Sequence, residues 1–471
     1  MTRVFIRDSL NKIGEKIKLA GWVGARRDHG KLIFIDLRDK TGTIQAVFNN
    51  KDEKIFKLAE ELRQDYVIEI EGFLRERPQS MVNQEIESGK VEVSADNLKI
   101  LNKAETPFFD ENKEGYDINE ELRLKYRYLD LRRPRLQNNL KMRHSVIQYI
   151  RDYLTKNNFT EIETPILTKS TPEGARDYVV PSRLRQGSFY AIPQSPQQYK
   201  QLLMVAGFER YFQIARCFRD EDTRGDRQPE FTQLDIEMSF VEQNDILALI
   251  EDLFTGLVRK LYPQKKITQS PWPRLSHSRA QKEFGTDKPD LRKDKKNPDE
   301  LAFAWTIDFP LFAKQTEEDF FHGSGSAKFA PSHHMFTAPH PDDIALLDTD
   351  PLKVRGLQHD FVLNGYEVGG GSIRIHQPEV QEKIFDLIGF TAEQKNNFQH
   401  LLTAFTYGVP PHGGIAPGVD RFMMILQNEP NIREVIAFPK TGDGRDPMMG
   451  APSEISKKQL KELGIKIVTS D

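Results

Sequence analysis

The stretch FRDEDTRGDRQPEFTQLDIEMSF, residues 218–240, decides the fold of the larger part of this chain. It starts as a strand, passes through a charged loop and continues as a second strand, in which Phe231, Gln233, Asp235 and Glu237 alternate onto one face. The pattern predicts an antiparallel hairpin. With Arg219 on the first strand, that face offers a cation for phosphate, a ring for a base and a carboxylate for a metal ion or an amine. For this segment alone, a surface hairpin with weak ion pairs is the alternative.

A second hairpin is predicted over residues 358–376, QHDFVLNGYEVGGGSIRIH. Asp360 and Glu367 flank an expected turn at Asn364 and Gly365, so the two strands can bring both carboxylates together to hold a divalent cation against phosphate oxygens. The three consecutive glycines that follow let backbone and ligand approach closely. A Gly-rich turn beside a strand is weak evidence when it is taken alone.

A third segment, GVPPHGGIAPGVDRFMMILQN at residues 408–428, reads as a small-residue strand leading into a helix that begins near Gly418 to Asp420. Arg421 lies in the first turn of this helix, where the helix dipole disfavours a cation. Such an arginine indicates either a phosphate neighbour or a side chain that is simply solvated. The chain contains no P-loop and no dinucleotide fingerprint, so any ATP must be bound by another architecture.

Residues 16–101 contain five strand-like runs, with one helical stretch at residues 52–63 after the third run. This order is typical of a small Greek-key barrel that often binds oligonucleotides. The sequence therefore predicts an α+β protein in three parts: a barrel domain over 1–104, a linker or hinge over 105–130, and a larger domain over 131–471.

The segment 123–143 carries eight Lys or Arg residues against one Asp. It is either a solvated helix face or a contact to an RNA backbone. Further along, apolar residues at helical spacing predict a helix over 144–158. Ser195 and Pro196 predict the N-cap and the first position of another helix.

The composition is that of an ordinary soluble protein. A length of 471 residues, with 38% apolar and 29% charged residues, predicts two or three domains. The formal charge of -3 argues against indiscriminate adhesion to nucleic acid. The single cysteine, Cys217, is expected in the core rather than in a disulfide or a zinc site. No stretch approaches the roughly 20 apolar residues of a membrane span, and the first residues lack the apolar core of a secretion signal, so we expect a cytoplasmic protein.

Taken together, the three charged segments resemble the motifs of class II aminoacyl-tRNA synthetases, and the resemblance covers essentially the whole chain. FTEIETP, ending at Pro165, resembles the first motif, which forms the homodimer interface in that family. The segments STPEGARDY, QSPQQYKQLLM, NGYEVGGGSIRIH and FPKTGDGRDPMMGAPS resemble the aspartyl enzymes of bacteria. The resemblance implies activation of L-aspartate by ATP to an aspartyl-adenylate, followed by transfer to the 3′ end of tRNA(Asp).

The resemblance also implies roles for individual residues. The expected catalytic residues are Arg219, on the α-phosphate, and Arg421, on the γ-phosphate of a bent ATP. Further nucleotide contacts are implied for Asp220, Glu221, Gln228, Phe231, Glu367, Gly418, Val419 and Asp420. The implied aspartate contacts are Glu173, Gln197, Lys200, Arg219, His333 and Arg374, with Lys200 and Arg374 offering two cations to the side-chain carboxylate. Mg²⁺ is expected on Asp360 and Glu367. No protein residue has to act as a general base, because the chemistry rests on positioning and charge stabilisation.

In the barrel, the resemblance places Phe34, Gln45 and Glu92 where aspartyl enzymes read the anticodon. A ring there can stack on an unpaired base, and polar groups can bind base edges. His29 occupies a position where enzymes that also charge tRNA(Asn) often carry His, so we expect a relaxed choice of tRNA. Ser80 is a weaker second determinant, and the alternative for His29 is a plain turn residue beside Gly30.

One departure from the bacterial pattern is expected: a large inserted domain is missing near residues 291–300, which should leave catalysis intact and weaken tRNA binding. The nearest alternative function is a sibling synthetase for asparagine or lysine. A different class of alternative is a non-catalytic RNA-binding paralogue, which would be expected to lose motif residues that are present here.

Overall fold

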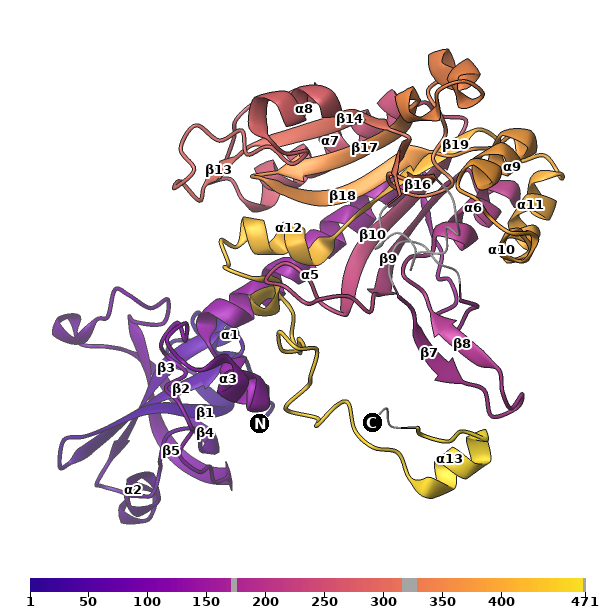
Figure 1. Cartoon of the computed structure of the whole chain (residues 1–471). Helices are drawn as coiled ribbons and strands as arrows, with labels where there is room; N and C mark the ends of the chain where they lie inside the picture. Colours follow the sequence, from indigo (N-terminus) through magenta and orange to yellow (C-terminus); the bar gives the residue numbers. More distant parts are fainter. Residues whose placement is uncertain (171–175, 316–327, 469–471) are drawn as a thin grey trace. The chain divides into compact units, whose positions relative to one another are not determined.

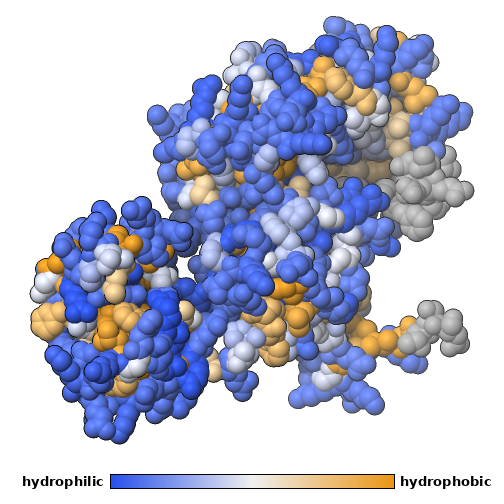
Figure 2. All heavy atoms as spheres, turned by 90° about the vertical axis from the view of Figure 1, so that its left-hand side faces the viewer, coloured by the Kyte–Doolittle hydropathy of each residue, from blue (hydrophilic) through white to orange (hydrophobic). Residues whose placement is uncertain are grey.

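The computed structural model describes residues 1–170, 176–315 and 328–468 (Figure 1). The chain falls into two compact units, Met1–Asp110 and Glu111–Asp471. Among the described residues, none of the helices combines the length and the apolar character needed to cross a membrane. The face of the molecule seen in Figure 2 is mostly hydrophilic, with apolar side chains scattered over it.

The first unit is a closed five-stranded barrel of order β1-β2-β3-β5-β4, in which β3 and β5 pair in parallel and the other neighbours pair antiparallel. Alternate residues of each strand point inward; in β2 these include Ile33, Ile35 and Leu37, all fully buried. The predicted barrel with a helix after its third strand is confirmed. Its elements are α1 Ile6–Ser9, β1 Lys16–Asp28, β2 Leu32–Asp39, β3 Gly42–Asn49, α2 Glu53–Glu60, β4 Val67–Glu76, η1 Gln79–Met81 and β5 Val91–Asn102.

The second unit is built on an eight-stranded sheet of order β12-β14-β17-β18-β19-β10-β9-β6, antiparallel except at its two ends. One face of this sheet packs against helices α5, α7 and α12 in a single apolar core. The opposite face of the central strands carries polar side chains. The strands are β6 Thr160–Glu161, β9 Arg210–Phe218, β10 Glu230–Ser239, β12 Arg274–Ser276, β14 Phe303–Pro310, β17 Arg355–Leu363, β18 Tyr366–Ile373 and β19 His412–Pro417.

Helices and small sheets surround the central sheet, and a second apolar cluster lies under α9 and α11. The helices are α3 Glu120–Lys125, α4 Arg127–Asp130, α5 Pro134–Lys156, α6 Gln197–Val205, α7 Gln243–Leu261, α8 His277–Phe284, η3 Pro341–Leu347, η4 Pro351–Lys353, α9 Pro378–Leu387, α10 Ala392–Asn396, α11 Gln399–Phe405, α12 Val419–Leu426, η5 Ile432–Val435 and α13 Lys457–Leu463. The small strand pairs are β7 Tyr178–Pro181 with β8 Phe189–Ile192, β11 Lys266–Ile267 with β13 Glu300–Leu301, and β15 Phe312–Lys314 with β16 Phe329–Pro331.

Both predicted hairpins are present. β9 pairs with β10, and β17 pairs with β18 through a turn in which Asn364 and Gly365 have positive φ angles of 53° and 86°. Helix α6 begins one residue later than predicted, because Pro196 is its N-cap rather than its first helical residue. Cys217 is buried in β9, where its Sγ lies 3.2 Å from Gln233 Oε1, as expected of a core residue.

The linker and the basic segment differ from the prediction. The boundary between units lies after Asp110, so most of residues 105–130 belongs to the second unit. Arg123 is buried because its guanidinium binds Asp130 and Glu434, with an Nη2–Oε2 distance of 2.7 Å to Glu434. Arg133 is also fully buried against Asp130. These arginines form an internal ion-pair network, so they are neither a solvated helix face nor free to bind RNA.

The region where an inserted domain was expected to be missing is a short connection between α8 and β13. The backbone N–H groups of Lys293 and Asp294 both donate to the carboxylate of Glu300, at 3.0 Å each. These two hydrogen bonds hold the start of the connection against Glu300. The absence of a large domain that relatives carry at this point stays a prediction.

Candidate active site

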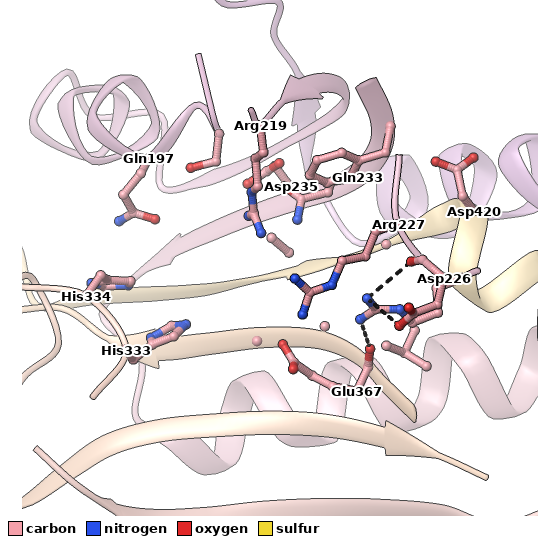
Figure 3. Close-up of a pocket in the computed structure, with 18 of the residues that line it drawn as sticks. Gln197, Arg219, Asp226, Arg227, Gln233, Asp235, His333, His334, Glu367 and Asp420 are labelled. Atoms are coloured by element: carbon pink, nitrogen blue, oxygen red, sulfur yellow. Dashed lines mark hydrogen bonds and ion pairs between the residues drawn. The ribbon is translucent and has the colours of Figure 1, made fainter. Parts of the chain in front are cut away.

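A cavity of about 340 Å³ lies over the polar face of the sheet, between the two hairpins and the start of α12 (Figure 3). Twelve of the predicted site residues line it, although they come from five separate segments of the chain. They are Gln197, Lys200, Arg219, Glu221, Gln228, Phe231, His333, Glu367, Arg374, Gly418, Asp420 and Arg421. Glu173 lies outside the described residues.

Three predicted residues lie elsewhere. Asp220 is half-exposed outside the cavity, 3.6 Å from the Arg176 guanidinium. Val419 is buried in the apolar core, so only its backbone can face a nucleotide. Asp360 is buried beneath the cavity floor rather than on its lining.

The nucleotide half of the cavity is formed by the β9–β10 hairpin and α12. The Arg219 guanidinium lies 5.1 Å from the centre of the Phe231 ring, so a cation and a flat ring stand side by side. Arg421 donates through Nη1 to the backbone carbonyl of Glu367, and its Nη2 lies 3.1 Å from Asp226 Oδ2; dashed lines mark these contacts in Figure 3. An anionic group of the protein therefore already pairs with Arg421.

Gln228 lines the cavity, yet its amide is bound elsewhere. Its Nε2 donates to the carbonyl of Lys440 at 3.1 Å, and its Oε1 accepts from the N–H of Lys440 at 2.7 Å. Thr223, in the same loop, donates to the carbonyl of Gly442. The loop between β9 and β10 is thus tied to residues 440–442, which sequence reasoning did not include in the site.

Two cations and the carboxylate of Asp235 line the other half of the cavity, and the carboxylate of Glu237 pairs with both cations; all four side chains are almost completely buried. Lys200 Nζ lies 2.9 Å from Asp235 Oδ1 and 3.5 Å from Glu237 Oε2, and Arg374 Nε lies 3.0 Å from Glu237 Oε1. Lys200 and Arg374, which are expected to bind a substrate carboxylate, therefore each already have an internal partner. The alternation of Asp235 and Glu237 along β10 is the sequence signal for these partners.

Burial pushes the pKa of Glu237 upward, but the charges of Arg374 and Lys200 outweigh burial and hold its pKa below the ordinary value. Glu237 is therefore ionised at neutral pH. Asp235 Oδ2 is buried and has no hydrogen-bond partner among the described residues. An unsatisfied carboxylate oxygen at this depth is costly, so it indicates a cationic ligand group.

Two neighbouring histidines line the same half. Burial, aided by the charge of Arg374, lowers the pKa of His333 to about 4, so this ring is neutral at neutral pH. Its Nδ1 has no hydrogen-bond partner within the described part of the chain. Arg374 Nη1 lies 2.6 Å from Nε2 of His334, which sequence reasoning did not single out.

Asp360 and Glu367 meet around Gly370, as the hairpin predicted. A Cβ added at Gly370 would lie 3.4 Å from Asp360 Oδ1 and 3.7 Å from Glu367 Oε1, so glycine leaves room between the backbone and both acids. Burial and the charge of Glu367 raise the pKa of Asp360. Burial also favours a raised pKa at Glu367, but its ion pair with Lys288, 2.9 Å away, lowers it. Among the described residues no group of three or more acidic, His or Cys side chains forms a complete metal site.

In the barrel unit, the predicted anticodon residues share one outer face. Gln45 Nε2 donates to Glu92 Oε2 at 2.7 Å, and Arg27 Nη2 donates to Gln45 Oε1 at 3.3 Å. Phe34 lies opposite Arg27 in the β1–β2 pair. The ring of His29 stands edge-on to the ring of Phe34, with centroids 5.3 Å apart. Ser80 lies in η1, where it is exposed.

Comparison with known proteins gives consistent results for both units. Residues 119–442 match the family model "tRNA synthetases class II (D, K and N)", and residues 17–101 match "OB-fold nucleic acid binding domain". A relative from Rubrobacter xylanophilus, named aspartate–tRNA(Asp/Asn) ligase, is 43% identical and covers 97% of this chain and 95% of its own. A relative from Staphylococcus epidermidis, named aspartate–tRNA ligase, is 41% identical and covers 97% of each chain.

Solved structures agree on the fold. The asparaginyl-tRNA synthetase of Pyrococcus horikoshii, complexed with asparaginyl-adenylate, superposes with a TM-score of 0.75 at 22% identity, covering 94% of this chain and 98% of that one. The aspartyl-tRNA synthetase of Entamoeba histolytica gives 0.72 at 21% identity, covering 93% and 91%. The predicted resemblance and fold class are confirmed. This chain belongs to the class II tRNA synthetases of the D, K and N group and carries their OB-fold nucleic acid binding domain.

Proposed function

We propose that this chain is an aspartate–tRNA ligase that activates L-aspartate with ATP and transfers it to tRNA(Asp) and tRNA(Asn). One observation supports the amino acid above all others. The cavity places two buried cations, Lys200 and Arg374, beside the unsatisfied carboxylate oxygen of Asp235. That arrangement suits a ligand with a carboxylate at one end and an ammonium at the other.

In this proposal the side-chain carboxylate of aspartate binds Lys200 and Arg374, and its ammonium binds Asp235 Oδ2. Glu237 orients both cations before the substrate arrives. Asparagine has the same shape but no side-chain charge, so it would lose several kcal/mol of pairing in a desolvated pocket. Gln197 and His333 complete the walls around the amino acid, with His333 neutral and able to donate or accept a hydrogen bond.

The nucleotide would lie with its adenine on Phe231 and its phosphates toward Arg219 and Arg421. Arg421 must exchange its pairing with Asp226 for the γ-phosphate. The α-carboxylate of aspartate then attacks the α-phosphorus, forming a P–O bond as the bond to pyrophosphate breaks. The carboxylate is already ionised at neutral pH, so no protein group has to remove a proton. In the second step the terminal ribose 3′-hydroxyl of tRNA attacks the acyl carbon, its proton passes to a phosphate oxygen of the adenylate, and AMP leaves as the acyl C–O bond to the phosphate breaks.

Asp360 and Glu367 fit a divalent cation, because the buried carboxylate of Asp360 and the partly exposed carboxylate of Glu367 meet around Gly370, and the pKa of Asp360 is raised. We propose Mg²⁺ there, with phosphate oxygens supplying the ligands that the protein does not. The ion would neutralise charge on the phosphates. In the structure Lys288 forms an ion pair with Glu367, so this ion pair would have to break before Glu367 could bind the ion.

For the tRNA, we propose that Phe34 stacks on an anticodon base while Gln45 and Glu92 bind base edges. The edge contact of His29 with Phe34 supports a role for His29 in the choice between tRNA(Asp) and tRNA(Asn). Exposed Ser80 is the second candidate. The relative from Rubrobacter xylanophilus bears a name that covers both tRNAs.

We also propose that the protein acts as a cytoplasmic homodimer through α5 and the segment that ends at Pro165. Ile166 and Leu167, which directly follow this segment, are 49% and 53% exposed, which supports a covered surface in the assembly.

Pyrophosphate exchange with aspartate, asparagine and lysine tests the amino acid. Exchange with aspartate alone is expected, whereas exchange with asparagine and none with aspartate would favour the sibling enzyme. Exchange with none of them would favour the RNA-binding paralogue.

Aminoacylation of purified tRNA(Asp) and tRNA(Asn) by wild type and His29→Leu tests the tRNA choice. Wild type should charge both, and the variant should lose mainly tRNA(Asn); a wild type that charges tRNA(Asp) alone would refute relaxed specificity.

A further inference from the structure

The carboxylate of Asp420 joins three elements of the second unit. Asp420 lies in the first turn of α12, where it is 3% exposed. Its Oδ2 accepts from the backbone N–H of Thr232 in β10 at 2.7 Å, and its Oδ1 accepts from the guanidinium of Arg143 in α5. In Figure 3 this carboxylate stands at the margin of the cavity, away from Arg227 and Glu367. Both oxygens are thus occupied by protein donors.

The backbone of β10 needs this acceptor. Regular pairing between β10 and β19 runs from Ser239 to Ile236, and beyond it an isolated bridge joins Gln233 to Gly418. Thr232 is 5% exposed, so its N–H would be buried without a partner if Asp420 were absent. The carboxylate therefore replaces a strand partner where β10 and β19 separate.

Thr232 and Asp420, the two ends of this hydrogen bond, are each a direct chain neighbour of a proposed ATP ligand. Phe231 precedes Thr232 in the chain, and Arg421 follows Asp420. A bond between Thr232 and Asp420 consequently sets the distance between the proposed adenine site and the proposed γ-phosphate site. Arg143 neutralises the buried carboxylate, without which the charge of Asp420 would be costly.

We infer that Arg143 and Asp420 are positioning residues for ATP: the Arg143–Asp420–Thr232 contact holds Phe231 and Arg421 at the spacing that a bent nucleotide requires. This inference rests on the proposed ATP site and corrects one of its expectations, since Asp420 acts through its neighbours rather than on the nucleotide. In the described part of the chain, the ion pairs of Lys200 and Arg374 are made with Asp235 and Glu237 and not with Arg143 or Asp420, so we expect the effect to be confined to ATP.

The test is steady-state pyrophosphate exchange with Arg143→Met, Arg143→Lys, Asp420→Asn and the double variant Arg143→Met/Asp420→Asn. Arg143→Met should raise KM for ATP by about tenfold or more, while KM for aspartate stays within about twofold. Arg143→Lys should recover part of the loss, because it keeps the charge. The double variant should be no worse than the more impaired single variant, because both changes break one contact.

Arg279→Met is the control: it removes an exposed arginine of α8, paired with Glu283 at the surface, and should leave both KM values unchanged. A general loss of stability would alter both substrates and would not be rescued by lysine. Equal changes in the two KM values, or additive effects in the double variant, would overturn the inference. If Arg143→Met does not fold, a normal KM for ATP in Arg143→Lys and Asp420→Asn would overturn it too. Wild-type exchange with the amino-acid panel tests the proposed function separately, and these variants are then assayed with whichever amino acid is activated.

Discussion

The two halves of the cavity hold their charges in different ways. In the amino-acid half, Lys200, Arg374 and Glu237 are at most 2% exposed and are paired with one another or with Asp235. In the nucleotide half, Arg421 and its partner Asp226 are 24% and 32% exposed. A buried pair is costly to break, whereas a partly solvated pair contributes roughly 0–1 kcal/mol. The comparison indicates that the charged groups of the amino-acid half are already arranged before the substrate binds. In the nucleotide half, Arg421 must first exchange Asp226 for a phosphate group.

The largest expected effect is at the prebuilt half. Arg374→Gln leaves Glu237 without its closest cation and removes a proposed aspartate contact, so kcat/KM for aspartate should fall by at least about 1000-fold. Pyrophosphate exchange measures this, and thermal unfolding measures the accompanying loss of stability. Arg355→Gln on the neighbouring strand, where Arg355 pairs with Asp343 outside the cavity, is the control. Aspartate activation within about tenfold of wild type would contradict a prebuilt amino-acid half.

A second prediction separates the two halves by substrate. Asp235→Asn keeps the shape of the side chain but removes the charge proposed to hold the ammonium, so KM for aspartate should rise by about 100-fold while KM for ATP changes by less than about threefold. Glu230→Gln on the same strand, paired with Arg216 and Lys440 near the surface, serves as the control. A similar rise in both KM values would mean that Asp235 supports the whole cavity instead.

Burial of the amino-acid half also predicts sensitivity to acid. Burial lowers the pKa of His412 to about 4, and Gln201 Nε2 lies 3.2 Å from its ring Nε2. The unfolded chain binds a proton at His412 more readily than the folded chain does. The contribution of neutral His412 to the free energy of unfolding is therefore complete above about pH 6.5. It is lost as the pH falls toward 4, by up to about 3 kcal/mol.

Thermal unfolding of wild type between pH 7.5 and 4.5 measures that loss, and His412→Gln should make the midpoint less dependent on pH. An unchanged slope in the variant would show that other groups cause the acid sensitivity. The pH range of this comparison is chosen from the folded and unfolded pKa values of His412.

The smallest expected effect is at the nucleotide half. Asp226→Asn weakens the group that competes with ATP for Arg421, so KM for ATP should fall by about two- to threefold. Pyrophosphate exchange at low ATP measures it. Asp222→Asn in the same loop, for which no contact with Arg421 is recorded, is the matched control. A rise in KM for ATP would show that Asp226 helps to bind the nucleotide rather than competing with it.

Much of the fold and most of the cavity could be predicted from the sequence, because the signals are local. Alternation in β10 places Gln233 and Asp235 on one face, and the Asn364–Gly365 turn fixes the second hairpin and brings Asp360 toward Glu367. The bonding of Gln228 to Lys440 could not be predicted, since the two are 212 residues apart and the contact uses main-chain atoms.

By itself the sequence determined that Gln233 and Asp235 share one face of β10 and that Asp360 and Glu367 come together across a turn, because the period of a strand and the geometry of a turn extend over only a few residues. The tertiary structure alone decided which of those charges are already paired. Arg374 and Glu237 are 137 residues apart, and Arg123 and Glu434 are 311 apart, so neither pair leaves a local pattern. Burial then decides their chemistry: the same arginine is an RNA ligand when it is solvated and an internal counter-ion when a carboxylate meets it in the core.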